Sequence, residues 1–131
     1  MIRKSTKAIS GAQRHKGYVP DRGDVVWLNL EPRLGREQGG HRTCLVLSPA
    51  GYNAKTDLAV FCPITNQIKG YSFEVALPSG IQTTGVVLAD HIKSLDWRVR
   101  RARFRENLPR SVVDEVLDAA MTLLEAEDTK G

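Results

Sequence analysis

Short runs of apolar and β-branched residues recur about every ten residues between positions 24 and 89. Pro, Gly, Asn and Asp separate these runs, and these residues favour turns. Each run is long enough for one strand, whereas helices that contribute to a core need a longer repeating pattern. We therefore predict a small barrel or sandwich of antiparallel strands rather than alternating strand–helix units. The predicted strands are residues 24–30, 43–48, 58–63 (ended by Pro63), 72–77 and 85–89.

The spacing of apolar residues changes from strand-like to helical after Pro109. A proline suits the first turn of a helix, and acidic residues occupy the positions between the apolar ones. We expect one amphipathic helix of about four turns that packs over the sheet. The fold class is thus mainly β with α (α+β). The predicted apolar face consists of Val112, Val113, Val116, Leu117, Ala120, Leu123 and Leu124.

The 131 residues suffice for one domain, and the charge is unevenly distributed along them. Residues 1–17 are basic and lack a hydrophobic period, so we expect a disordered extension before a single domain at 18–131. Residues 21–110 hold thirteen bases against nine acids, whereas residues 111–131 hold six acids and one lysine. The predicted sheet is therefore basic, which favours a polyanionic partner.

Several classes of protein do not fit this sequence. No apolar run approaches the roughly 20 residues that cross a bilayer, and no apolar region follows the basic N-terminus as in a secretory signal. We expect a cytoplasmic protein without a membrane partner. Cys44 and Cys62 lie in apolar runs without metal-ligand spacing, which predicts buried, reduced thiols. The three histidines are scattered, so we expect no metal or other cofactor.

Residues 34–42 combine three glycines with a dense set of functional side chains. This segment lies between two predicted strands, and functional groups often occupy loops on a rigid scaffold. Guanidinium groups match phosphate oxygens and a carboxylate can transfer a proton, so the set favours a phosphodiester ligand. A solvated hairpin loop is the alternative interpretation. The candidate residues are Arg36, Glu37, Gln38, His41 and Arg42.

A second polar segment, residues 64–70, follows the third predicted strand. Arg42 and Thr65 both lie where a loop meets a strand, and together they could hold one phosphate. RNA carries its own nucleophile, the 2′-OH, so an enzyme needs only proton transfer and stabilisation of the phosphorane charge. Glu37 or His41 could accept the proton, Arg42 could stabilise the charge and Thr65 could orient an oxygen. The proton donor stays open, because the pKa of arginine is very high.

The chain resembles the MazF/PemK family of toxin endoribonucleases from bacterial type II toxin–antitoxin pairs, and the MazF branch in particular. The resemblance extends in collinear order over about residues 18–125. Its motifs are Tyr18-Val19-Pro20-Asp21, Gly23-Asp24, Gly35, Glu37-Gln38-Gly39-Gly40-His41-Arg42, Val46-Leu47-Ser48-Pro49, Tyr52-Asn53, Pro63-Ile64-Thr65, Lys69-Gly70-Tyr71, Phe73-Glu74-Val75, Gly85-Val86-Val87-Leu88-Ala89-Asp90, Lys93-Ser94 and Trp97-Arg98.

This resemblance implies an SH3-like barrel of antiparallel strands with a C-terminal helix. It implies a homodimeric toxin that cleaves single-stranded RNA at short sequences without metal, leaving a cyclic phosphate and a 5′-hydroxyl. Arg42 and Thr65 correspond to the family's catalytic pair, and Glu37 also belongs to the site. Some members read a base with a glutamine at the position of His91, so the recognised sequence is left open. The candidate substrate-binding residues are Arg36, Gln38, His41, Lys69 and His91.

The resemblance also implies a MazE-like antitoxin whose extended, acidic C-terminal tail covers the RNA groove of the dimer. A basic sheet is the electrostatic complement of such a tail. Two alternative functions are a non-catalytic toxin of the same fold that poisons DNA gyrase, and a module that binds RNA or DNA without cleavage. A gyrase poison has no reason to keep Glu37, Arg42 and Thr65 together.

Overall fold

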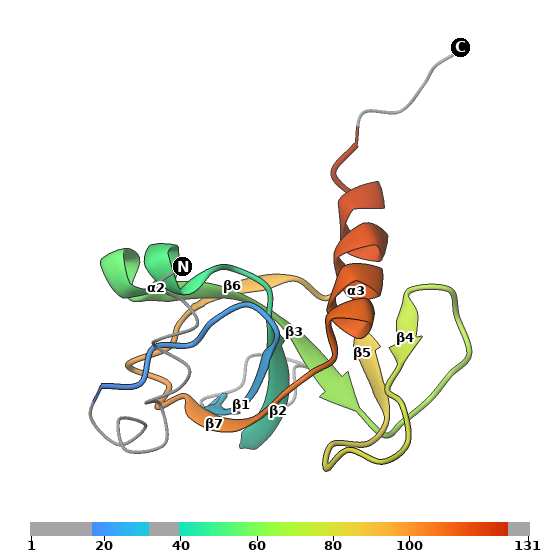
Figure 1. The fold of residues 1–131 in the computed structure, drawn as a ribbon, viewed down its shortest axis with the longest axis horizontal. Helices are drawn as coiled ribbons and strands as arrows, with labels where there is room; N and C mark the ends of the chain where they lie inside the picture. Colours follow the sequence, from blue (N-terminus) through green and yellow to red (C-terminus); the bar gives the residue numbers. More distant parts are fainter. Residues whose placement is uncertain (1–16, 32–39, 126–131) are drawn as a thin grey trace.

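Seven strands form one antiparallel sheet in the computed structural model, which describes residues 17–31 and 40–125 (Figure 1). Their order across the sheet is β4-β5-β3-β2-β1-β7, and β6 pairs with β3 away from this path. The α+β class with a C-terminal helix is confirmed. The strands are β1 (Asp24–Asn29), β2 (His41–Val46), β3 (Leu58–Thr65), β4 (Glu74–Ala76), β5 (Val86–Leu88), β6 (Lys93–Asp96) and β7 (Arg103–Asn107).

Alternation of side chains along β1 gives the sheet two apolar faces. Val25 belongs to a cluster that includes residues of helix α3 (Arg110–Thr122), whereas Val26 and Leu28 belong to a second cluster that includes Phe61 and Trp97. Adjacent residues of a strand point to opposite faces, so a run that is apolar at every position is buried on both sides. The central position of β2, between β1 and β3, agrees with this pattern.

Strand β3 continues past Pro63, which is a correction of the predicted end at that residue. Pro63 pairs with Cys44 at the last position of the β2–β3 ladder, and the next residues, Ile64 and Thr65, pair with β5 instead. A residue without an N–H is tolerated at such a transition, because the strand changes its hydrogen-bonding partner there. The strand therefore carries Thr65 two residues past its last pair with β2.

Strands β6 and β7 occupy segments for which the sequence predicted no separate strand. Strand β7 lies at one edge of the described sheet, where it pairs with β1. A four-residue turn region separates Trp97 from Ala102, and the Ala102 N–H donates to the Trp97 carbonyl. Trp97 itself is buried beneath the short helix α2 (Ala50–Thr56), where its indole N–H donates to the Asn53 carbonyl.

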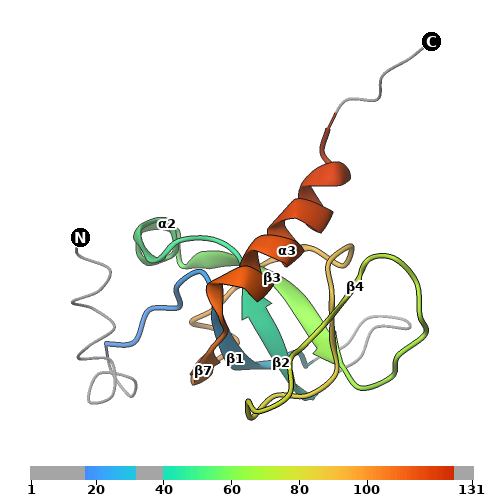
Figure 2. The same cartoon turned by 45° about the vertical axis from the view of Figure 1, so that its right-hand side comes forward.

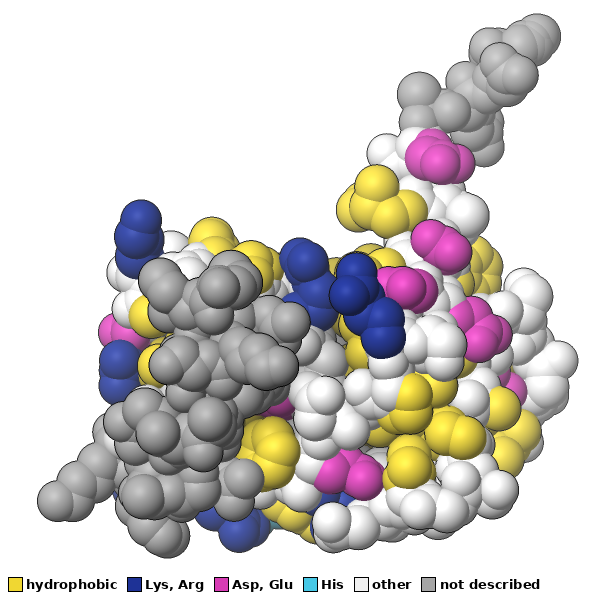
Figure 3. All heavy atoms as spheres, in the orientation of Figure 1, with side chains coloured by type: hydrophobic (Ala, Val, Ile, Leu, Met, Phe, Trp, Pro, Cys, Tyr) yellow, Lys and Arg dark blue, Asp and Glu magenta, His cyan; other side chains and the backbone are white. Residues whose placement is uncertain are grey.

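Helix α3 (Arg110–Thr122) begins after Pro109, as predicted, and buries Val112, Val113 and Val116 against the sheet. Its C-terminal part projects beyond the sheet, and Leu123 and Leu124 are exposed (Figures 1 and 2). The predicted apolar face is therefore only partly buried within this chain. Acidic side chains are spaced along the projecting helix (Figure 3), in agreement with the acidic C-terminal composition.

Cys44 and Cys62 are buried free thiols, as the sequence predicted. Burial raises the pKa of each thiol to about 12, so neither is a nucleophile at neutral pH. Within residues 17–31 and 40–125, no helix has the length and the apolar character that crossing a membrane requires. The predicted disorder of residues 1–17 concerns a segment that, up to residue 16, lies outside the described part of the chain.

Candidate active site

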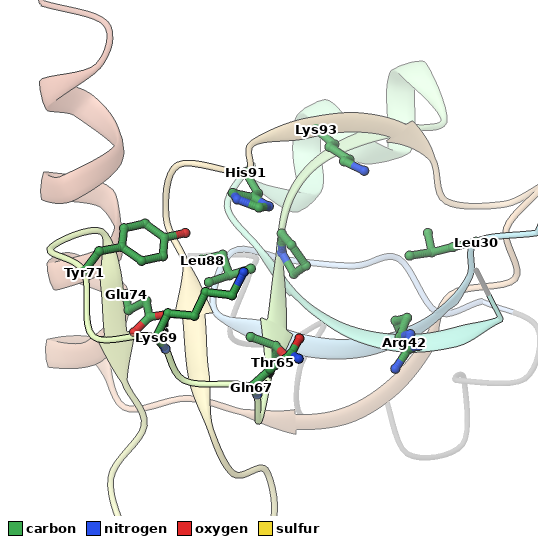
Figure 4. A pocket seen from close by; sticks show the side chains of 11 residues that line it. Leu30, Arg42, Thr65, Gln67, Lys69, Tyr71, Glu74, Leu88, His91 and Lys93 are labelled. Atoms are coloured by element: carbon green, nitrogen blue, oxygen red, sulfur yellow. Dashed lines mark hydrogen bonds between the residues drawn. The ribbon is translucent and has the colours of Figure 1, made fainter. Parts of the chain in front are cut away.

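A cavity of about 470 Å³ opens beside the C-terminal end of β3 (Figure 4). It lies beyond the apolar cluster of Leu28, Cys44 and Phe61, on the side of the sheet that helix α3 does not cover. Arg42 lies on one side of the cavity in Figure 4 and Lys69 and Tyr71 on the other, with Thr65 between them. The lining residues are Leu30, Arg42, Pro63, Thr65, Gln67, Lys69, Tyr71, Glu74, Leu88, His91 and Lys93.

The strand pairing explains why Arg42 and Thr65 share this cavity. Cys44 faces Pro63 in the β2–β3 ladder, so Arg42 and Thr65 each lie two residues beyond that last pair. Residues two apart on a strand point to the same face. The two side chains therefore leave the same face of the sheet, from neighbouring strands. The two polar segments predicted from the sequence thus converge at their described residues Arg42 and Thr65.

The hydroxyl of Thr65 is oriented by its own loop. Its Oγ1 accepts a hydrogen bond from the Gln67 N–H at 3.0 Å, which leaves the O–H to act as a donor. Gly85 packs directly against the Thr65 carbonyl: a Cβ at Gly85 would lie 2.2 Å from that oxygen, and its φ of +108° favours glycine. Close contact with Gly85, the residue before β5, therefore holds the backbone of Thr65 in place beside the cavity.

Positive charge dominates the cavity. Among the described residues, Arg42, Lys69 and Lys93 line it together with one carboxylate, that of Glu74. Both oxygens of this carboxylate are engaged by backbone N–H groups, at 2.9 Å from Lys69 N and 2.8 Å from Gly70 N. Such a site can hold an anion with several oxygens, because the cations converge and the carboxylate charge is partly compensated.

Two aromatic side chains form another part of the cavity wall. The hydroxyl of Tyr71 donates to Asp90 Oδ1 at 3.2 Å, and the Nε2 atom of His91 lies 3.8 Å from the same oxygen. Partial burial and the nearby Asp90 carboxylate, followed by Glu74, raise the pKa of Tyr71, so its phenol stays protonated. Both rings present faces on which a base could stack.

The structure brings together four of the residues proposed from the sequence: Arg42, Thr65, Lys69 and His91. His41 begins β2 next to Arg42, is exposed and is not among the side chains that line the cavity. Strand alternation directs it to the opposite face. Arg36, Glu37 and Gln38 lie outside the described residues, so their predicted roles stay predictions.

Sequence reasoning did not single out Tyr71, Glu74 or Lys93 as site residues. Each belongs to a motif that carries the family resemblance, but none lies in the two loops from which we argued the chemistry. They reach the cavity because β5 and β6 pair with opposite halves of β3 and β4 pairs with β5. Their presence in these motifs was the sequence signal that could have identified them as site residues. Among the described residues, no three His, Cys, Asp or Glu side chains cluster in a way that could hold a metal ion.

Comparison with known proteins gives consistent matches. Residues 21–124 match the family model of the PemK-like, MazF-like toxin of type II toxin–antitoxin systems. The chain is 53% identical over 85 residues to the endoribonuclease toxin MazF of Escherichia coli K12, covering 65% of this chain and 76% of that protein. It is 36% identical over 108 residues to the endoribonuclease PemK of Escherichia coli, covering 79% and 81%.

Solved structures match over most of the chain as well. The crystal structure of MazF from Deinococcus radiodurans (Form-I) superposes with a TM-score of 0.77 and 54% identity, covering 82% of this chain and 97% of that one. A MazE–MazF structure from the same organism (Form-II) gives a TM-score of 0.75 and 48% identity, covering 84% and 99%.

Proposed function

The chain belongs to the family of PemK-like, MazF-like toxins of type II toxin–antitoxin systems, and from this premise we propose that its cavity cleaves single-stranded RNA. The protein is an endoribonuclease toxin, like the MazF and PemK proteins that it matches. The proposal adds the form of the substrate, the nucleophile and the residues that act. The nucleophile is the 2′-OH of the RNA itself, and no metal ion takes part.

The observation that carries the proposal is the convergence of Arg42 and Thr65 on one basic cavity. In attack by a 2′-OH, negative charge develops on the two non-bridging oxygens of the phosphate. A guanidinium can hold two oxygens at once, and a hydroxyl donor can hold one. We assign charge stabilisation to Arg42 and orientation of a phosphate oxygen to Thr65.

The remaining roles follow from the chemistry of the other side chains. Glu37 accepts the proton of the 2′-OH in this proposal. Lys69 binds the RNA backbone, and His91 contacts a base beside the cut. Arg36 and Gln38 bind the substrate from the same loop. Single strands suit such a site, because their base faces and edges are accessible.

The cognate partner of a type II toxin is an antitoxin, and the MazE–MazF structures support such a partner for this chain. We propose that the antitoxin is MazE-like and that its acidic C-terminal tail enters the basic cavity in place of RNA. The active form is proposed to be a cytoplasmic homodimer. The exposed apolar residues at the end of α3, Leu123 and Leu124, are compatible with a further protein contact.

The proposal is tested with one short RNA and two matched changes. Cleavage is expected to continue in excess EDTA and to stop when a single 2′-deoxy sugar replaces the ribose at the cut. The products should carry a 2′,3′-cyclic phosphate and a 5′-hydroxyl. Cleavage of the 2′-deoxy substrate at the same bond would rule out attack by the 2′-OH. Tight binding of RNA without any cleavage would instead favour the nucleic-acid-binding module.

A further inference from the structure

Each oxygen of the Glu74 carboxylate accepts a hydrogen bond from the backbone of the loop that precedes it. Its Oε2 accepts the Lys69 N–H at 2.9 Å and its Oε1 accepts the Gly70 N–H at 2.8 Å. Glu74 is the first residue of β4 and pairs with Leu88 of β5, so the carboxylate projects from an ordered strand. The two hydrogen bonds therefore tie an exposed loop to the sheet.

The same loop carries a cation into the cavity. Lys69 lines the cavity, and Figure 4 shows its side chain extending from the Glu74 side toward the centre. Gly70 has a φ of +87°, and the Glu74 N–H donates to the Tyr71 carbonyl at 3.1 Å, which closes the chain into a tight turn. The position of the Lys69 side chain thus depends on the turn that Glu74 holds.

The charge of Glu74 would otherwise oppose the proposed function. A carboxylate that lines a phosphate-binding cavity repels the substrate, so on charge grounds alone its removal should tighten RNA binding. The hydrogen bonds from two backbone N–H groups compensate part of that charge, and they give Glu74 a structural role in the site. Loss of the Glu74 charge should tighten RNA binding, whereas loss of its positioning role should weaken it. The two effects therefore predict opposite changes in Kd for the same substitution.

We propose that Glu74 is a positioning residue that holds the Lys69–Gly70 turn, so that the Lys69 ammonium group faces the phosphates of a bound RNA strand. Glu74 acts through the loop backbone and does not touch the RNA. The inference rests on the proposed function, because it requires that RNA binds in this cavity. It assigns the effect of Glu74 to Lys69 and to no other cation.

The test measures the Kd of the full chain for a single-stranded RNA that carries a 2′-deoxy sugar at the cut and is not cleaved. The variants are Glu74→Ala, Lys69→Ala and the double variant. Glu115→Ala is the matched control, since it removes an acidic charge from an exposed position on α3 outside the cavity. Thermal unfolding checks that each variant is folded.

Loss of one well-positioned cation should weaken binding about five-fold, so Lys69→Ala and Glu74→Ala should each give an increase in Kd of that size. The double variant should bind within about two-fold of Lys69→Ala, because the second change finds no positioned cation to lose. In both single variants the slope of log K against log salt should fall by about 0.7, as expected for one lost phosphate contact to a single strand. Glu115→Ala should leave this slope unchanged.

Glu74→Gln provides the second variant if Glu74→Ala does not fold. Its amide oxygen can still accept one N–H, whereas its NH₂ group cannot accept the other, so an intermediate Kd is expected. Tighter or unchanged binding in either folded variant, or additive effects in the double variant, would overturn the inference. If the wild-type protein neither binds nor cleaves RNA, the proposed function fails; if it cleaves RNA and Glu74→Gln binds more tightly, only the role of Glu74 fails.

Discussion

Arg42 and Thr65 each lie two residues beyond Cys44 and Pro63, the last pair of the β2–β3 ladder, and both side chains line one cavity. The cavity exists because β3 leaves β2 at this point and pairs with β5 through Ile64 and Thr65. Beyond the last pair of the ladder, Arg42 and Thr65 both line a basic cavity that a polyanion can enter. The geometry of the site is therefore a consequence of the sheet topology.

Gly85 is expected to be essential for this geometry. A Cβ at this position would lie 2.2 Å from the Thr65 carbonyl oxygen, so Gly85→Ala must displace the backbone of Thr65. We expect RNA cleavage to fall at least ten-fold and the free energy of unfolding to fall as well. Cleavage rates and chemical denaturation of the purified variant measure the two effects.

Gly80→Ala is the matched control for Gly85→Ala. Gly80 also has a positive φ, +87°, but a Cβ there would meet no atom within 4 Å. Its substitution should cost only the strain of the left-handed conformation, about 1 kcal/mol, without loss of cleavage beyond the change in stability. Equal effects of the two substitutions on cleavage would show that the contact with Thr65 has no catalytic consequence.

Asn53 is expected to be the most sensitive polar residue of the core. It is fully buried, its Nδ2 donates to the Pro20 and Ser48 carbonyls at 2.8 and 3.0 Å, and its Oδ1 accepts the Ser48 hydroxyl at 2.7 Å. Asn53→Ala leaves these groups buried without partners, which should lower the free energy of unfolding by about 2–4 kcal/mol. Urea denaturation at one fixed protein concentration measures the change.

Lys55→Ala on the same helix provides the comparison for Asn53→Ala. Lys55 is exposed, and its substitution should change the free energy of unfolding by less than about 0.5 kcal/mol. A loss for Asn53→Ala as small as that for Lys55→Ala would mean that water replaces the missing hydrogen bonds.

Glu106 should make the stability of the protein dependent on pH in the acidic range. Partial burial by itself would raise the pKa of Glu106, but hydrogen bonds from the Thr83 hydroxyl, the Thr83 and Gln82 N–H groups and the charge of Arg105 together lower it below 4.5. A carboxyl whose pKa is lower in the folded state stabilises the protein above its unfolded pKa and loses this contribution as the pH falls through the folded pKa.

The difference in unfolding free energy between wild type and Glu106→Gln measures this contribution. It should be constant near neutral pH and shrink as the pH falls below about 4.5. A difference that grows on acidification would contradict the direction of the Glu106 shift.

The sequence predicted the elements whose patterns are strong and local. The strand of Val25, Val26 and Leu28 alternates between two apolar clusters, and the helix after Pro109 repeats its apolar residues every three to four positions. Strand β7 escaped prediction, because Phe104 is its single large apolar residue and charged residues surround it. Charges are common on edge strands, where they oppose pairing with other chains, and this obscures the pattern of alternation.

The predictable part of the site was the part that adjoins two strong strands. The sequence predicted that Arg42 and Thr65 lie near each other, because their strands were expected to be neighbours. The proximity of Glu74, Tyr71 and Lys93 to this site was not predicted, because it depends on which strand pairs with β5 and with β6. Long-range packing determines this strand pairing, and no local pattern of residues encodes it.

The most direct test of the shared phosphate site is the mapping of 5′ ends on a long RNA after brief exposure to wild type, Arg42→Ala or Thr65→Val. Wild type should cut at one short recurring sequence, and each variant should cut there about 10²–10³-fold more slowly, with an unchanged melting temperature. The valine keeps the branched shape of Thr65 and removes only its hydroxyl. Cleavage by both variants at the wild-type rate and at the same sequence would contradict the assignment of Arg42 and Thr65 to the scissile phosphate.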